Sequence, residues 1–207
     1  MGDVISLSAR NPGRSHPVPE PVAFLFSPGC AISYLVAERA ERALGEVDWV
    51  PVLPLAQPDA VLLGAARREA HALRLPLELP ENPLADCRPL IRVACLASEY
   101  DACAQFGLVA SRLIFCGGYE LDDPQVISEA AELAGIPAGE ALRVAADTTY
   151  DAALETTTAA LRRRGLRQTP VVRIGHRWFE GFQALSGAAM ALPGGSKGRF
   201  SVPSVQR

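Results

Sequence analysis

The order of its apolar segments most constrains what this 207-residue chain can fold into. Residues 22–26 are an apolar run between Pro21 and a Ser-Pro-Gly sequence, which predicts a buried strand. Residues 31–44 repeat apolar side chains at helical spacing, and residues 47–52 are a second strand-like run. A strand, a helix and a strand in direct succession predict two parallel strands joined by a crossover helix.

A long helical stretch separates this unit from the end of the chain. Alanine and leucine dominate it, and Asp123-Pro124 has the residue types that open a helix. The expected helices cover residues 58–75, 84–115 (as two helices broken near Gly107), 124–135, 137–145 and 149–164.

The last part of the chain returns to strands. Residues 169–174 and 177–180 predict a hairpin around Gly175-His176, followed by a helix over 182–192. Without the central helices the order is βαβ followed by ββα, which is the order of the thioredoxin fold. We therefore predict an α/β protein with a thioredoxin-like domain. Its expected parts are residues 21–56 and 166–192, with an all-helical insertion over 57–165.

Composition excludes several classes of protein. With 49% hydrophobic and 21% charged residues the chain is not disordered as a whole, although residues 1–20 and 193–207 are expected to be a disordered leader and a flexible tail. The net charge of −3 and the lack of a basic run argue against nucleic acid, and no apolar stretch is long enough for a membrane span. Five cysteines without a C-x-x-C pair favour a reducing, cytoplasmic setting, and nothing resembles a secretory signal.

Cys30 is the first candidate for chemistry because it would begin the helix over residues 31–44. The unpaired N–H groups and the positive dipole end of a helix favour a thiolate over a thiol. Ser33, three residues later, could turn its hydroxyl toward the sulfur across one helical turn. The alternative is that Cys30 is only a small apolar residue in a strand-to-helix turn.

Thr169-Pro170 is the second candidate, because Pro170 opens a strand where it removes a hydrogen-bond donor. A cis peptide bond would account for this position, and a plain trans proline at a strand start is the alternative. In a thioredoxin-type fold such a proline faces the reactive residue, and Thr169 would offer its backbone to a bound thiol or peptide.

Several short motifs follow the order of one known family. Residues 24–35, FLFSPGCAISYL, fit without a gap a family segment that reads like FYFD-x-x-SPYSYL, and residues 37–39 and 47–53 are similar to its AER helix and WxPVLL strand. Residues 81–84, 121–124 and 169–172 are similar to its P-x-N-T-L segment, its SDP helix start and its VPTF strand. Over residues 21–190 the chain resembles the DsbA-like thioredoxin superfamily. Within it, the likeness is to the branch of 2-hydroxychromene-2-carboxylate isomerases and kappa-class glutathione transferases.

The resemblance implies catalytic roles. Cys30 takes the place of the isomerases' catalytic serine or of the first cysteine of DsbA, and Ser33 takes the place of DsbA's second cysteine. A rival alignment puts Ser27-Pro28 on the family's Ser-Pro and makes Ser27 the catalytic residue, but it needs an insertion before Tyr34.

The resemblance also implies binding residues. Asn82 could make a polar contact in the cleft between the two domains, or it could cap a helix. Gly181 lies in the turn where the family carries an aspartate that holds the γ-glutamyl amine of glutathione. Here the turn reads EGFQA, without a carboxylate after Gly181, so glutathione stays an open expectation as cofactor.

The remaining cysteines and the histidines indicate no metal site. Cys87, Cys95 and Cys103 are spaced by eight residues, which leaves successive side chains about 80° apart around a helix, so they are expected to be small core residues. His16, His71 and His176 have no metal-ligand spacing to cysteine.

Three functions fit these features. The first is a thiol-dependent oxidoreductase that uses Cys30. Because C-x-x-S lacks a resolving cysteine, it would need an external thiol such as glutathione. The second is an isomerase or transferase acting on a small aromatic substrate between core and insertion. The third is a catalytically degenerate member that binds a ligand. Kappa-class relatives are dimers, so a homodimer is expected by resemblance.

Overall fold

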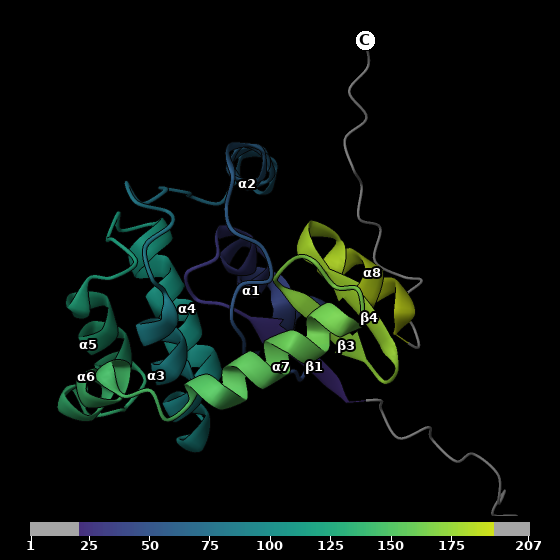
Figure 1. Ribbon diagram of the computed structural model, residues 1–207. Helices are drawn as coiled ribbons and strands as arrows, with labels where there is room; N and C mark the ends of the chain where they lie inside the picture. Colours follow the sequence, from purple (N-terminus) through teal and green to yellow (C-terminus); the bar gives the residue numbers. More distant parts are fainter. Residues whose placement is uncertain (1–20, 193–207) are drawn as a thin grey trace, which may run out of the picture.

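The computed structural model describes residues 21–192, and its centre is a mixed four-stranded sheet (Figure 1). The strands are β1 (Val22–Phe26), β2 (Asp48–Pro51), β3 (Val171–Ile174) and β4 (Arg177–Glu180), in the spatial order β2-β1-β3-β4. β1 is parallel to β2 and antiparallel to β3, which in turn is antiparallel to β4. The two ends of the chain therefore build one sheet, as the α/β thioredoxin-like prediction requires. The expected leader (1–20) and tail (193–207) lie outside the described residues.

The helices connect and cover this sheet. In chain order they are α1 (Ala31–Leu44), α2 (Ala60–Leu73), α3 (Arg88–Glu99), α4 (Cys103–Phe115), α5 (Pro124–Leu133), α6 (Ala138–Ala146), α7 (Asp151–Arg163), the 3-10 turn η1 (Gly181–Gln183) and α8 (Ala184–Ala191). None of them has both the length and the apolarity to cross a membrane, within the described part of the chain.

Both faces of the sheet are covered, which is why β1 is apolar at every position. Phe24 and Phe26 face the large core built with α1, α8 and the helices of the middle segment. Ala23 and Leu25 face a smaller cluster to which Leu161 of α7 belongs. Figure 1 shows α7 crossing one face of the sheet, with α3 to α6 grouped to one side. The helical segment thus supplies one helix that covers the sheet, while its boundaries as a domain stay a prediction.

The break between α3 and α4 differs from the prediction. It lies at residues 100–102, where Asp101 has a φ of 54°, and not near Gly107. Gly107 lies inside α4, and the ring of Phe26 packs so closely against it that only glycine fits there. A Cβ at this position would lie 2.5 Å from Phe26 Cε2. The glycine therefore serves a close contact between helix and strand and does not end a helix.

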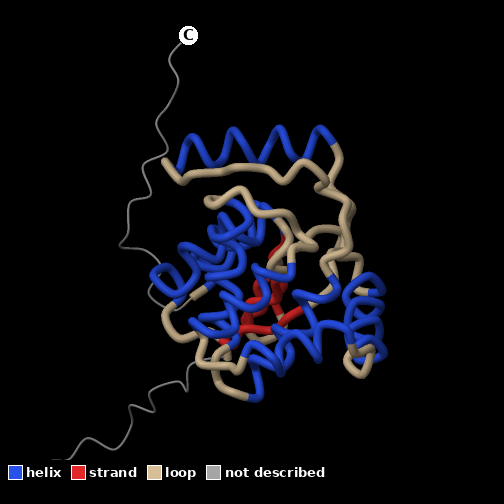
Figure 2. The backbone as a smooth tube through the Cα atoms, turned by 90° about the vertical axis from the view of Figure 1, so that its left-hand side faces the viewer, coloured by secondary structure: helices blue, strands red, loops and turns tan. Residues whose placement is uncertain are grey.

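Helix α2 lies at the edge of the molecule and packs against α1 through few residues. Figure 2 shows it as a separate helix with a loop running back along it. Only Ala66 and Ala70 of this helix are buried. The returning segment, residues 74–87, contains no helix or strand and ends directly at the start of α3. This segment brings Leu79, Leu84 and Cys87 to the mouth of the cavity described next.

Candidate active site

Cys30 is the N-cap residue of α1. Its backbone is extended (φ −105°, ψ 117°), and its carbonyl accepts the first helical hydrogen bond, from Tyr34 N at 3.0 Å. The preceding turn is closed by a 3.0 Å bond from Cys30 N to Ser27 O and is tied to α4 by Ser111 Oγ, which donates to Pro28 O. Cys30 is half-buried. The sulfur thus lies at the N-terminus of a helix and is partly accessible to a reactant.

Thr169 and Pro170 lie directly beside this cysteine. The peptide bond between them is cis. The Cys30 sulfur is 3.8 Å from the backbone oxygen of Thr169 and 3.8 Å from its hydroxyl oxygen. On the other side, Pro170 O accepts a 2.8 Å hydrogen bond from Gly181 N, which joins the starts of β3 and η1. Chain segments far apart in sequence therefore form one wall around the sulfur.

Ser33 does not occupy the position expected from its spacing. Its side chain is buried, and its hydroxyl accepts a 3.3 Å hydrogen bond from Ser27 N. No hydrogen bond joins it to Cys30 within residues 21–192. Ser33 therefore stabilises the turn before the helix and not the sulfur, because the i, i+3 side chain points into the core.

Ser27, the alternative catalytic residue, is also enclosed. It is fully buried, and its hydroxyl has no hydrogen-bond partner among the described residues. It does not line the cavity next to Cys30. A substrate in that cavity therefore meets Cys30 and not Ser27, which leaves no geometric support for the rival alignment.

Asn82 and Gly181 have local structural roles. The Asn82 side chain is exposed and accepts a hydrogen bond from Leu84 N, so it shapes a turn and does not line the cavity. Gly181 has a φ of +62°, and a Cβ there would clash with the Gln168 side chain. The positive φ requires glycine, whereas the Gln168 amide is the end of a flexible side chain that could move aside.

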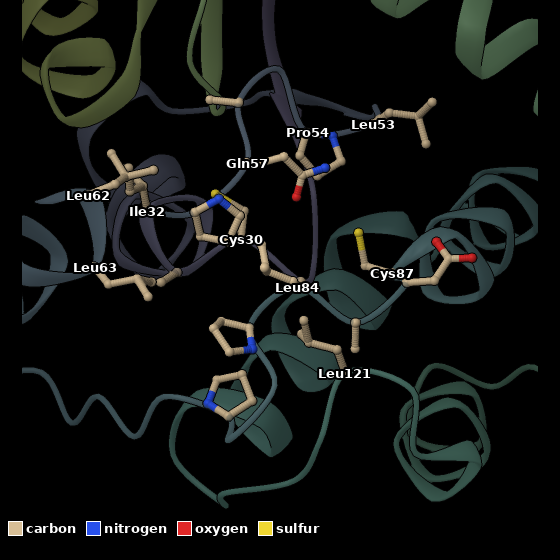
Figure 3. Close-up of a pocket in the computed structure, with 18 of the residues that line it drawn as sticks. Cys30, Ile32, Leu53, Pro54, Gln57, Leu62, Leu63, Leu84, Cys87 and Leu121 are labelled. Atoms are coloured by element: carbon tan, nitrogen blue, oxygen red, sulfur yellow. The ribbon is translucent and has the colours of Figure 1, made fainter. Parts of the chain in front are cut away.

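A cavity of about 480 Å³ opens at Cys30, between α1, α2 and the segment that leads into α3 (Figure 3). This volume is that of an ordinary small-molecule site. Most of its wall is apolar, formed by Ile32, Leu53, Leu62, Leu63, Leu79, Leu84, Phe115 and Leu121. Polar side chains line it as well: Gln57, Asp86, Arg88, Glu155, Thr158 and Arg162. The site therefore suits a molecule with an apolar body and a few polar groups.

Cys87 is the site residue that the sequence analysis missed. It was expected to be a core residue like Cys95 and Cys103, but it lines the same cavity as Cys30. The pKa of the Cys87 thiol is raised to about 11, mainly by burial, with the nearby Ser27 hydroxyl acting in the opposite direction and the charge of Asp86 adding to the rise. Burial also raises the pKa of Cys95 to about 12 and that of Cys103 to about 11. The spacing by eight could not identify Cys87, because Cys87 lies before the helix and not within it.

The described residues contain no group of three or more metal-ligating side chains. The five cysteines are all unpaired, and Cys116 is the exposed one. The Cys116 sulfur lies 3.2 Å from the Tyr34 hydroxyl, directly after α4, and does not line the cavity. Its exposure makes it a competitor in any chemical labelling of Cys30.

Solved structures of known proteins share the fold. One is a 2-hydroxychromene-2-carboxylate isomerase, with a TM-score of 0.70 and 17% identity over 82% of this chain and 93% of that chain. A protein from Streptomyces coelicolor described as a probable DsbA oxidoreductase has a TM-score of 0.66 and 19% identity, over 90% and 94% of the two chains. The cytosolic disulfide reductase DsbM from Pseudomonas aeruginosa, also solved with GSH, has a TM-score of 0.58 and 17% identity, over 81% and 93%.

No curated protein matches the sequence significantly. At the identities found, the solved structures establish the shared fold. The family itself rests on the sequence: the model of the DSBA-like thioredoxin domain matches residues 22–192, and the chain therefore belongs to this family.

Proposed function

We propose that this protein is a thiol–disulfide oxidoreductase in which Cys30 is the nucleophile. The observation that carries the proposal is the position of the Cys30 sulfur. It lies at a helix N-terminus, 3.8 Å from the Thr169 backbone oxygen and at the edge of a cavity. A helix end stabilises the thiolate, and the cavity admits a small thiol or disulfide. A disulfide reductase with the same fold has been solved with GSH, which supports glutathione as one such molecule.

The chemical step is thiol–disulfide exchange. The Cys30 thiolate attacks one sulfur of a disulfide R–S–S–R′, forms Cys30–S–S–R and releases R′–S⁻. An external thiol, such as glutathione, attacks the R sulfur, restores the Cys30 thiolate and leaves as the mixed disulfide GS–S–R. A second glutathione then attacks this mixed disulfide, forms GSSG and releases R–S⁻. Two electrons have then passed from two glutathione molecules to the original disulfide, and the protein is back in its starting state.

A small-molecule thiol is therefore the proposed partner, in a reducing, cytoplasmic setting. The test is reduction of bis(2-hydroxyethyl) disulfide by glutathione, followed through NADPH consumption by glutathione reductase. We expect turnover by the wild type and by Cys116→Ser, which removes the exposed thiol away from the cavity. Cys30→Ser should be inactive but folded, because the change is nearly isosteric. Equal activity of Cys30→Ser and wild type would overturn the proposal.

A second candidate is an isomerase or transferase for a small aromatic substrate. The apolar lining of the cavity favours it, and an isomerase structure has the same fold. Serine is the residue that the isomerase branch is expected to carry at this position, so Cys30→Ser should keep isomerase activity while it loses exchange activity. Assaying both activities on that variant separates the two candidates. Ligand binding with neither activity would indicate a catalytically degenerate member.

A further inference from the structure

Two cysteines from different parts of the chain face one cavity. Cys30 begins α1, and Cys87 is the N-cap of α3, which lies in the helical segment. Both residues line the cavity and both are half-buried. Figure 3 shows them on two sides of the cavity. The sequence contains no C-x-x-C pair, so this juxtaposition exists only in the folded chain.

Gly29 keeps the two cysteines close. A Cβ built on Gly29 would lie 2.8 Å from Cys87 Cβ and 3.6 Å from its sulfur, so any side chain at residue 29 would displace Cys87. Gly29 is the direct neighbour of Cys30, with about 3.8 Å between their Cα atoms. These contacts limit the separation of the Cys30 and Cys87 Cα atoms to about 10 Å at most, whereas a disulfide needs about 4.4–6.8 Å.

The segment before Cys87 can supply the remaining movement. Residues 74–87 contain no helix or strand, and Cys87 is the last residue before α3 begins. Its side chain makes no capping hydrogen bond that would hold it at the helix end. Bond formation requires rotation about the Cα–Cβ bonds of both cysteines and a shift of Cys87 toward Cys30, and the mixed disulfide on Cys30 would have to be held beside Cys87 while this happens.

We propose that Cys87 is the resolving cysteine of Cys30, so that the protein forms an internal Cys30–Cys87 disulfide during its cycle. This inference rests on the proposed function, because it needs Cys30 to form a mixed disulfide first. Cys87, from across the cavity, would then do the work of the second cysteine of a C-x-x-C motif. Ser33, which stands at that position in the sequence, instead accepts a hydrogen bond from Ser27 N.

The step balances as follows. Cys30–S–S–R is attacked at the Cys30 sulfur by Cys87, the Cys30–Cys87 bond forms, and R–S⁻ leaves. The proton of the Cys87 thiol passes to water or to the leaving thiolate. The protein has then lost two electrons and the disulfide substrate has gained them as two thiols. Two molecules of a small thiol such as glutathione reduce Cys30–Cys87 again.

The two thiols differ in a way that suits these roles. Burial keeps the pKa of Cys87 at about 11, so at neutral pH it is almost entirely the thiol and does not compete for the first attack. Cys30 lies at the helix end, beside Thr169, and is the sulfur a substrate meets. Cys87 reacts only once a mixed disulfide is held next to it.

The test uses the full chain in the Cys116→Ser background, oxidised with glutathione disulfide and quenched with acid. Mass spectrometry of the intact protein separates a glutathione adduct from an internal disulfide, and peptide mapping locates either bond. We expect a Cys30–Cys87 disulfide with little lasting adduct. Cys87→Ser should hold the Cys30 adduct at least about tenfold longer, because nothing resolves it internally. Cys95→Ser is the matched control and should behave like the parent.

The possible results distinguish the two proposals. A lasting Cys30 adduct of equal lifetime in the parent and in Cys87→Ser would overturn the resolving role but leave Cys30 as the nucleophile. No adduct and no internal disulfide in any variant would overturn both. If Cys87→Ser does not fold, mapping of the parent decides alone, because an adduct on Cys30 without a Cys30–Cys87 peptide contradicts the resolving role.

Discussion

The Cys30 sulfur lies 3.8 Å from the backbone oxygen and 3.8 Å from the hydroxyl oxygen of Thr169, a residue 139 positions later in the chain. One residue begins the first helix and the other precedes the third strand. Because β1 and β3 are direct neighbours in the sheet, their connections meet at the same end. The position of Cys30 beside Thr169 is therefore built by the pairing of β1 with β3.

Cys30 should be alkylated faster than Cys95 and Cys103. In the Cys116→Ser background at neutral pH, we expect iodoacetamide to label Cys30 at least about tenfold faster than Cys95 and Cys103. Burial raises the pKa of those two thiols to about 12 and about 11, so few of them are thiolates. Mass spectrometry after timed quenching measures the rates. Equal labelling of the three cysteines would show that Cys30 is an ordinary buried thiol.

Gly29→Ala should destabilise the protein, whereas Gly139→Ala should not. A Cβ at residue 29 meets Cys87 Cβ at 2.8 Å and a Leu121 methyl at 3.2 Å, and such overpacking costs about 1–3 kcal/mol. A Cβ at residue 139 meets nothing within 4 Å and lies in α6, where alanine is favoured over glycine by up to about 1 kcal/mol. Urea unfolding measures both changes. A neutral Gly29→Ala would mean that Cys87 moves away freely.

Asp151→Asn should lower stability at neutral pH. Both carboxylate oxygens accept hydrogen bonds from Arg92, at 2.8 and 2.7 Å, and Arg92 also donates to Ala145 O. Removing the carboxylate leaves a mostly buried guanidinium without its counter-charge, at a cost of about 1–3 kcal/mol. Glu155→Gln removes the exposed partner of Arg88 and should cost less than about 1 kcal/mol. Similar losses in the two variants would contradict this ranking.

The ion pair between Asp151 and Arg92 also predicts how the stability of the protein depends on pH. The hydrogen bonds from Arg92 hold the pKa of Asp151 below its ordinary value in the folded state. The stabilisation is therefore complete above the unfolded pKa of about 4 and is lost as the pH falls through the lowered folded pKa. Unfolding free energies measured from pH 7 down to acid should converge for wild type and Asp151→Asn. A difference in unfolding free energy that stays constant across this range would show that the ionisation of Asp151 does not stabilise the folded state.

Thr158→Val should leave stability unchanged or raise it by up to about 1 kcal/mol. The Thr158 hydroxyl is buried and has no hydrogen-bond partner among residues 21–192, so replacing it by a methyl group removes an unsatisfied polar atom. Ser111→Ala is the matched contrast. Its buried hydroxyl donates to Pro28 O at 3.0 Å, and its loss should cost about 1–2 kcal/mol. Thermal melts should show an unchanged or higher melting temperature for Thr158→Val and a lower one for Ser111→Ala.

Much of the fold could be predicted from local patterns. The apolar run at residues 22–26, the helix over 31–44 and the strand at 177–180 occur with the predicted bounds. These elements are set by side-chain periodicity and by turn residues a few positions away. The helix break expected near Gly107 was wrong, because that glycine is required by the ring of Phe26 and not by the local backbone.

The sequence by itself determined that Cys30 begins a helix and that Pro170 opens a strand, since both follow from neighbouring residues. It could not determine where the Ser33 side chain points: its hydroxyl accepts a hydrogen bond from Ser27 N. Nor could it place Cys87 in the same cavity as Cys30, because the two residues are 57 positions apart and only the tertiary packing brings the start of α3 to that cavity. Local spacing specifies helices and strands. Which side chains share a cavity depends on packing between segments far apart in the sequence, so only the tertiary structure decided it.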